Sequence, residues 1–295
     1  MKIIKTHKIK VLEDPIRFVD YCVGKFEMLP SRSSVKKAIK KGVLKLNKDV
    51  CEYGRYLKLG DEIQFVEIEG EIAKEFKLKL EVVFEDDYLA VIHKPAGYVV
   101  SGNKFQTITN ALNFNLQDST QTDAIKPKPI HRLDGPTSGL LIIAKTAAMI
   151  KEMGQMLQRK EIQKTYHAVV IGVLEGSGKI DTPIDTQESL TEYHSLNVLP
   201  SLRNESTTLV KLHPKTGRTH QLRRHLSSIG HPIVGDKSYG IEGKVLLHKG
   251  LFLTSTGVQF KHPVTSEDII VEIPIPEKFH TFMEREAERW KKFKE

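Results

Sequence analysis

An apolar, β-branched run covers Leu140–Ala144 and ends at Lys145, which predicts a buried strand. The five residues before it, Gly135–Gly139, combine glycine, proline, threonine and serine, so they predict a turn. Asp134 therefore lies on a tight loop at the mouth of a rigid strand, where chemistry is often mounted. An aspartate there either caps the turn or reacts, and the spacing alone favours the cap.

The same kind of pattern predicts elements on both sides of this strand. Apolar runs predict strands at 78–84, 89–92, 164–173, 206–212 and 269–275. Proline and glycine predict a turn at 94–97. Helical spacing predicts helices at 107–116, 147–158, from Gly217 to Gly230, and near the C-terminus, where Phe279 to Phe293 form an aromatic stripe for docking. The polar, proline-containing segment 117–129 predicts a surface loop.

The first seventy residues have a different character. Asp14-Pro15 predicts a helix start, and the segment closes at Leu29-Pro30. Ser31 then caps a second helix that stops at Gly42, and strands follow at 43–48 and 57–66. Residues 31–48 contain no acidic side chain and seven cations, which favours a surface that faces phosphate. These cations are Arg32, Lys36, Lys37, Lys40, Lys41, Lys45 and Lys48.

The order helix, basic helix, strand, Leu-x-x-Gly-Asp turn and strand, over about 14–68, resembles a small RNA-binding module. That module is shared by a small-subunit ribosomal protein and tyrosyl-tRNA synthetases, and it usually has glycine where this chain has Lys48. The resemblance implies RNA binding without chemistry. A polar, glycine-containing linker follows. We therefore expect two domains, a small basic RNA-binding module of α/β type at 14–70 and a catalytic domain at 75–295.

Composition narrows the class of protein. With 295 residues, 39% hydrophobic and 28% charged, the chain reads as globular, and its net charge of +8 suits a phosphate-rich partner. No apolar run is long enough to cross a bilayer, and the start shows no secretory signal, so we expect a cytoplasmic protein. Cys22 and Cys51 are too few for a disulfide framework and fit a reducing compartment.

Basic residues and histidines are densest in the segment Thr216–Leu226. Its arginines point around a predicted helix, so at least one must face inward, where a buried guanidinium needs a carboxylate. A metal site is conceivable from the histidines, but no pair shows a spacing typical of ligands, and we expect no metal. These histidines are His131, His220, His225 and His231.

Four segments together resemble the RluA-type pseudouridine synthases. They are Glu85–Gly97, His131–Asp134, Lys164–Ala168 and Gly217–Arg223. The resemblance covers about 78–275 and implies an α+β fold: a mixed, largely antiparallel central sheet with flanking helices and the active site in a central cleft. It also implies an enzyme that isomerises uridine in structured RNA, ribosomal or transfer RNA, without a cofactor. We expect a monomer with no obligate protein partner.

The resemblance also assigns roles by position. Asp134 matches the catalytic aspartate, Tyr166 the tyrosine that lies against the target base, and Arg223 the basic residue that pairs with the aspartate. Substrate-binding residues are expected at Arg132, His131, Leu247, His220 and Gln221. Three departures from the family pattern bear on RNA contacts and substrate choice. They are Gly135-Pro136 after the aspartate, His93 in place of asparagine, and Lys249 in place of alanine.

The reaction breaks the bond between ribose and uracil nitrogen and rejoins the base through carbon. Water must be excluded, so a single carboxylate suffices, either as a nucleophile or as a base that takes a sugar proton. The target base must first leave its stack. Two other functions stay open: a non-catalytic RNA-binding or ribosome-assembly factor on the same fold, and a metal-dependent RNA hydrolase using Asp134 and the histidines.

Overall fold

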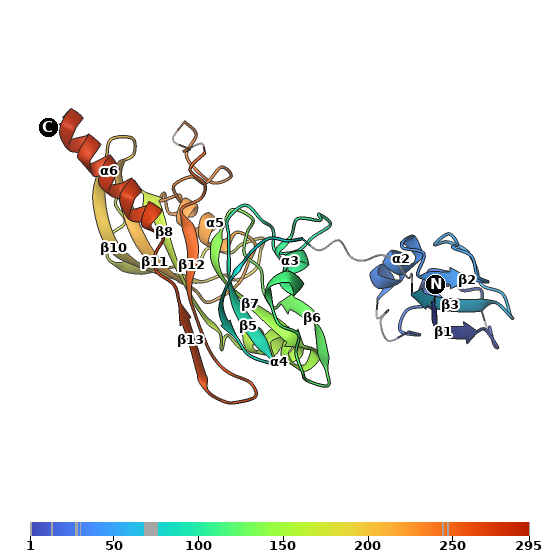
Figure 1. Cartoon of the computed structure of the whole chain (residues 1–295). Coiled ribbons are helices and arrows are strands. Elements are labelled where there is room, and N and C mark those ends of the chain that lie inside the picture. The colour runs from blue at the N-terminus through green and yellow to red at the C-terminus, as the bar shows by residue number, and fades with distance from the viewer. Residues whose placement is uncertain are drawn as a thin grey trace. The chain divides into compact units, whose positions relative to one another are not determined.

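A computed structural model describes residues 2–12, 14–26, 29, 31–67, 76–243, 245–246 and 248–294 (Figure 1). The chain divides into two compact units, Met1–Lys74 and Glu75–Glu295. In the described part of the chain, no helix is both long and apolar enough to cross a membrane.

The small unit is a three-stranded antiparallel sheet covered by helices. The strands run in the order β1 (Lys2–Lys8), β3 (Glu62–Glu67) and β2 (Leu44–Leu46). Helices α1 (Phe18–Tyr21) and α2 (Arg32–Lys40) contribute Phe18, Val35 and Ile39 to the buried core. Strand β1 belongs to this unit although it lies before residue 14, where the sequence resemblance begins.

Helix α2 confirms the predicted capping signal. The Ser31 hydroxyl accepts the backbone N–H of Ser34 at 3.2 Å, and the Ser34 hydroxyl accepts the Ser31 N–H at 3.1 Å in return. Gly42, just beyond the helix, has φ +69° and ends it as predicted. Because Val35, Ala38 and Ile39 are buried, the lysines of the opposite face are exposed.

The predicted helix start at Asp14-Pro15 is wrong. Helix α1 begins only at Phe18 and has four residues. The cause is a tertiary contact: Arg17 forms a β-bridge with Tyr56, and the Phe18 N–H donates to the Arg55 carbonyl at 2.8 Å, which holds Arg17 extended. These long-range bonds override the local capping pattern.

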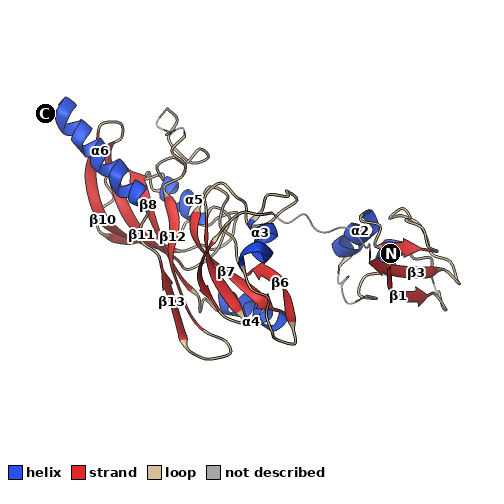
Figure 2. Ribbon diagram, viewed as in Figure 1, coloured by secondary structure: helices blue, strands red, loops and turns tan. Residues whose placement is uncertain are grey.

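The large unit contains one ten-stranded sheet, mixed and largely antiparallel, which confirms the predicted fold class (Figure 2). Eight strands form its main path: β4 (Glu81–Glu85), β5 (Leu89–Lys94), β7 (Ser138–Thr146), β12 (Leu253–Lys261), β8 (Gln163–Ile171), β11 (Glu205–Pro214), β10 (Thr191–Ser201) and β9 (Ser177–Ile180). Strand β6 (Ala124–Pro129) pairs with β7, and β13 (Asp268–Glu272) pairs with β12. Sequence patterns did not indicate β9, β10 or β12.

Helices cover the sheet. Helix α4 (Ala147–Gln158) packs Met149, Met153 and Met156 into a core with Leu140 and Ile142 of β7. The alternate residues of β7, Leu141 and Ile143, belong to a second core with α3 (Ile108–Asn115), α5 (Gln221–Ser228) and α6 (Glu277–Lys294). Strand β7 is therefore buried on both faces, which explains its unbroken apolar run.

The strands β7 and β12 pair in parallel only at Ser138–Thr254 and Gly139–Ser255. Gly139 has φ +115°, and a Cβ added there would run into the backbone of Ser255. Glycine at 139 thus lets the two halves of the sheet meet immediately after the loop that carries Asp134. The position of that loop depends on this close approach.

One prediction near the surface is wrong, and another holds except at its last residue. Residues 117–129 are not all loop, because Ala124–Pro129 forms β6 beside the end of β7; Pro127 and Pro129 are tolerated since β6 lies at an edge and its register is irregular. The C-terminal docking helix is confirmed in α6, whose Phe279, Phe282 and Met283 are buried. Phe293 lies outside the core, with 64% of its surface exposed.

Candidate active site

Asp134 lies on the connection from β6 to β7, and its side chain is only 16% exposed. Its backbone carbonyl accepts the N–H of Thr137 at 3.1 Å, so the segment is a turn, as the pattern predicted. A second bond, from the N–H of Gly97 to the carbonyl of Gly135 at 2.8 Å, ties this turn to the one after β5. The carboxylate itself is left for a partner from elsewhere in the chain.

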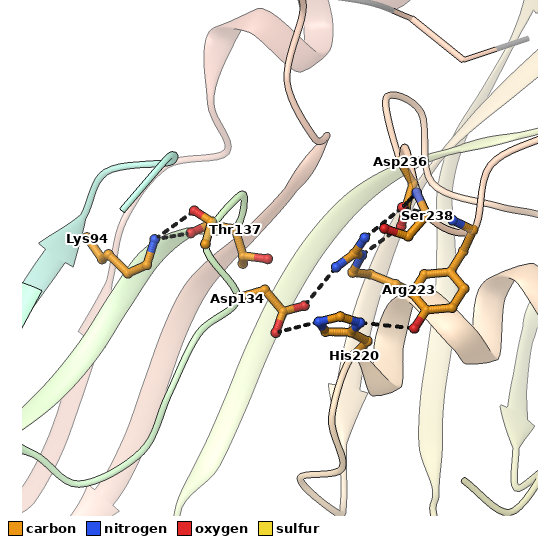
Figure 3. A network of polar contacts seen from close by, with 9 residues as sticks. Lys94, Asp134, Thr137, His220, Arg223, Asp236 and Ser238 are labelled. Atoms are coloured by element: carbon orange, nitrogen blue, oxygen red, sulfur yellow. Dashed lines mark hydrogen bonds and ion pairs between the residues drawn. The ribbon is translucent and has the colours of Figure 1, made fainter. Parts of the chain in front are cut away.

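That partner is Arg223 on α5. Its Nη1 lies 3.3 Å from Oδ2 of Asp134, while Nε and Nη2 each lie 2.7 Å from an oxygen of Asp236 (Figure 3). Asp236 is fully buried and also accepts the N–H groups of Ser238 and Tyr239. Burial alone would raise the pKa of Asp236, but the bonds from Arg223 and the backbone outweigh it and lower that pKa.

His220 approaches the other oxygen of Asp134. Its Nε2 lies 3.8 Å from Oδ1, and its Nδ1 lies 3.0 Å from the hydroxyl of Tyr239. The Tyr239 ring in turn faces the Arg223 guanidinium at 5.1 Å. His220 precedes α5 with φ +56°, a left-handed backbone that is costly for a residue with a side chain. Asp134, His220, Tyr239, Arg223 and Asp236 thus form one polar network.

Tyr166 of β8 and Asp134 line the same cavity of about 120 Å³, well above the ~15 Å³ that one water needs. Its ring is buried. Burial raises the pKa of Tyr166 to about 12, and the charge of Asp134 acts in the same direction. The phenol is therefore neutral around pH 7 and can donate a hydrogen bond into the cavity.

The structure brings most of the predicted site residues to this cavity. Of the three predicted catalytic and five predicted substrate-binding residues, six line it: Arg132, Asp134, Tyr166, His220, Gln221 and Arg223. Within this set, the side-chain amide of Gln221 is used in bonds that hold the fold. Its oxygen accepts from the Thr216 hydroxyl and the Arg218 N–H, and its NH₂ group donates to the Leu190 carbonyl and the Thr191 hydroxyl. Leu247 falls outside the described residues.

His131, predicted to bind substrate, does not line the Asp134 cavity. Its Nε2 accepts the backbone N–H of Ile142 at 3.2 Å, which ties the loop to β7. Burial, aided by the charge of Lys164, lowers the pKa of His131 to about 3, so the ring stays neutral and can accept this bond. The position of His131 favours a role in holding the loop.

Lys94 is one of the residues of this site that sequence patterns missed, since its segment reads as a plain turn. It is fully buried at the end of β5, and its ammonium donates to the carbonyls of Pro95, Gly135 and Thr137 at 2.9, 3.2 and 2.7 Å. Figure 3 shows the bond to Thr137. Two of these carbonyls belong to the turn that follows Asp134. Lys94 therefore fixes the shape of that turn from inside the sheet.

Asp236 and Tyr239 were also missed. The need of a buried guanidinium for a carboxylate was foreseeable from Thr216–Leu226, but nothing in the local pattern says which acid supplies it.

In the described part of the chain, no three His, Cys, Asp or Glu side chains gather as metal ligands. His225 and His231 bond Thr191 and the Ile171 carbonyl.

Comparison with known proteins decides the family. The family model for RNA pseudouridylate synthase matches residues 88–228, a range that contains Asp134, Tyr166 and Arg223. The ribosomal large subunit pseudouridine synthase D of Vibrio cholerae is 31% identical over 84% of this chain and 84% of its own. The tRNA pseudouridine synthase C of Haemophilus influenzae is 34% identical over 69% of this chain and 96% of its own.

The chain belongs to the RluA-type RNA pseudouridine synthases. As a pseudouridine synthase, it is an isomerase that converts uridine in RNA to pseudouridine. A solved structure, human RNA pseudouridylate synthase domain containing 1, shares the fold with a TM-score of 0.56 at 23% identity, over 67% of this chain and 84% of that one. The family resemblance seen in the sequence is thereby confirmed.

The buried ammonium of Lys94 predicts a pH dependence. Burial lowers its pKa to about 8, and the charge of Asp134 only partly offsets this. Above about pH 8 the amine keeps two protons for three carbonyls, so the turn loosens and we expect kcat to fall. The pKa of Lys94 in the folded protein lies below its ordinary value of 10.5. Between about pH 8 and 10.5 the unfolded chain therefore binds more protons at this group, and its contribution to the free energy of unfolding rises with pH. A fall of kcat in this range would thus not reflect unfolding caused by Lys94.

Lys94→Met tests this directly. Without the ammonium, we expect kcat to drop ~10- to 100-fold, because a displacement of about 1 Å at a reacting group costs that much. We also expect the variant to lose the decline above pH 8. Release of tritium from uridine C5, measured between pH 6 and 10 beside thermal unfolding, checks both points. An unchanged pH profile in the variant would show that Lys94 does not set it.

Proposed function

We propose that Asp134 is the carboxylate that reacts with the ribose of the target uridine, and that the target lies in ribosomal or transfer RNA. The observation that carries the proposal is the placement of Asp134: its side chain is only 16% exposed, is paired with Arg223, and lines the same cavity as Tyr166. The curated relatives support the RNA classes, since one is named for the large ribosomal subunit and the other for tRNA.

The geometry suits an isomerisation that must exclude water. The bond from ribose C1′ to uracil N1 breaks, the base turns, and C1′ rejoins the base at C5; N1 gains a proton and C5 loses its own. A free water at this stage would release the base. Asp134 is mostly buried, and the bond from Nη1 of Arg223 to its Oδ2 holds the carboxylate in place before the reaction begins.

Tyr166 supplies the apolar wall on which the uracil face would lie. Because its pKa is raised to about 12, its hydroxyl remains a proton donor across the physiological range. His220 would stand beside the reacting carboxylate, close to Oδ1. This arrangement of a charged carboxylate, its ion-pair partner and an aromatic wall favours catalysis over a passive RNA-binding factor on the same fold.

For the small unit we propose RNA binding through α2. Lys36, Lys37 and Lys40 lie on its exposed face, with Arg32 and Lys41 at its two ends. Asp20 pairs with Arg32 at 3.0 Å, so the charge of this arginine is partly neutralised within the protein. The remaining lysines can contact phosphates, whose interaction depends strongly on salt.

Asp134→Asn tests the catalytic assignment. The amide keeps the shape of the side chain and removes the charge that reacts, so we expect isomerisation to be abolished while RNA affinity stays within a few-fold, because phosphate contacts supply most of that affinity. Tritium release from uridine C5 and filter binding of the same RNA provide the two measurements. Full activity in this variant would refute the role of Asp134.

A triple variant tests the small unit. Replacing Lys36, Lys37 and Lys40 by alanine should make the slope of log K against log salt shallower by about 2 to 3, at ~0.7–0.9 per lost phosphate contact. The control removes three other exposed lysines of the same unit, Lys5, Lys8 and Lys58, and should change the slope much less. Equal effects of the two sets would mean that only total charge matters.

A further inference from the structure

A second cavity, of about 520 Å³, adjoins the Asp134 cavity. The two share five lining residues, so they form a continuous surface: Arg132, Lys164, Pro214, Thr216 and Gly217. Among the described residues, no aspartate or glutamate lines the second cavity, whereas four cationic side chains do. We call it the cation groove; its cations are Arg132, Lys160, Lys164 and Lys215. His131 and His213 also line it, but burial lowers the pKa of both rings, so the charge of the groove is assigned to the lysines and the arginine.

Lys164 lies at the junction of the two cavities, two residues before Tyr166 on β8. It is half-buried, and burial lowers its pKa. In the described part of the chain, its ammonium makes no hydrogen bond or ion pair with another side chain. A desolvated cation without a counter-ion destabilises the free protein, and a bound anion would remove that cost.

Lys160 is also held at a cost. It follows α4 in a left-handed conformation, φ +60°, where glycine is usual because side chains are strained there. The turn around it is a complete Schellman motif: the N–H of Glu161 donates to the Met156 carbonyl at 2.9 Å, and that of Lys160 to Leu157 at 3.3 Å. The backbone therefore needs no lysine at this position.

Nearby acids leave most of this positive charge open. Lys215 is paired with Glu192 at 3.0 Å. Glu161, the acid next to Lys160 in sequence, is taken by Arg159 at 2.9 Å. The charge available to a ligand thus comes from Lys160, Lys164 and Arg132, of which Lys164 and Arg132 also line the Asp134 cavity.

We propose that the cation groove binds the phosphodiester backbone of the RNA strand next to the target uridine, an inference that rests on the proposed function. A nucleotide turned into the Asp134 cavity remains joined to its neighbours, so its backbone must continue along a surface contiguous with that cavity. A groove that is basic and free of acids matches a chain of phosphates. Lys164 meets the phosphate nearest the target, and Lys160 meets one farther along.

Two substitutions separate this role from a structural one. Lys160→Gly removes a cation and relieves the strained backbone, so we expect its unfolding midpoint to rise by ~2–4 °C. Lys164→Met keeps the apolar stem and removes a charge without a partner, so its midpoint should not fall. Both should nevertheless bind RNA more weakly. Lys261→Ala, which removes an exposed lysine of β12 that lines neither cavity, serves as the charge control.

The probe is bulk ribosomal and transfer RNA from cells that lack the protein, labelled with tritium at uridine C5. The two substitutions are then combined in one double variant, Lys160→Gly with Lys164→Met. When salt is raised from 50 to 200 mM, the RNA affinity of this double variant should fall ~7- to 12-fold less than that of the wild type, the change expected for two lost phosphate contacts. Lys261→Ala should keep the wild-type midpoint and at least most of the wild-type slope.

Two results would overturn the inference: a double variant with the wild-type salt slope, or a fall of unfolding midpoint that accompanies weaker binding in both single variants. Tritium release keeps these results distinct from a failure of the proposed function. If the wild type releases no tritium from any RNA in the pool, the proposed substrate classes are wrong. If it does so and the double variant keeps the wild-type slope, the groove alone is wrongly assigned.

Discussion

The guanidinium of Arg223 serves two carboxylates at once, and the site depends on this double contact. One edge makes a bidentate pair with the buried Asp236, at 2.7 Å for each bond, which fixes the plane of the guanidinium. The remaining Nη1 then meets Asp134 at 3.3 Å. Asp236 thus positions Arg223, and Arg223 positions the carboxylate that is proposed to react. A buried arginine with only one of these partners would leave a charge uncompensated.

Charge balance around this pair extends into the sheet. Two carboxylates, Asp134 and Asp236, face two cations, Arg223 and the buried Lys94, whose ammonium holds the carbonyls of the turn after Asp134. At pH 7, where Lys94 is charged, the formal charges of the four groups sum to zero. The rigid frame comes from β7, packed on both faces, and from Gly139, which lets β12 approach. Fold and site therefore share the same few residues.

Much of this architecture could be predicted from local sequence patterns. The Ser31 helix cap, the limits of α4 and the buried strand β7 could be predicted because each is encoded within about a dozen neighbouring residues. What failed depends on distant partners. The start of α1 is set by the bridge from Arg17 to Tyr56, and β6 exists because β7 offers an edge to residues with little strand propensity.

The candidate site divides in the same way. Asp134, Tyr166 and Arg223 could be named because a family pattern carries them, and the structure places them around one cavity. Lys94 and Asp236 could not, since a lysine in a turn segment and an aspartate in a loop reveal their roles only after folding. His131 shows the converse: it stands inside the motif, yet its ring bonds the backbone of Ile142.

The central claim is that one guanidinium must hold both carboxylates. Arg223→Lys tests it most directly, because lysine keeps the charge but cannot form the fork that spans Asp236 and Asp134. The measurement is kcat for tritium release from uridine C5 at saturating RNA, with folding checked by thermal unfolding. The account predicts a loss of kcat of about a hundredfold with RNA affinity within a few-fold of wild type. A folded Arg223→Lys variant with wild-type kcat would contradict it.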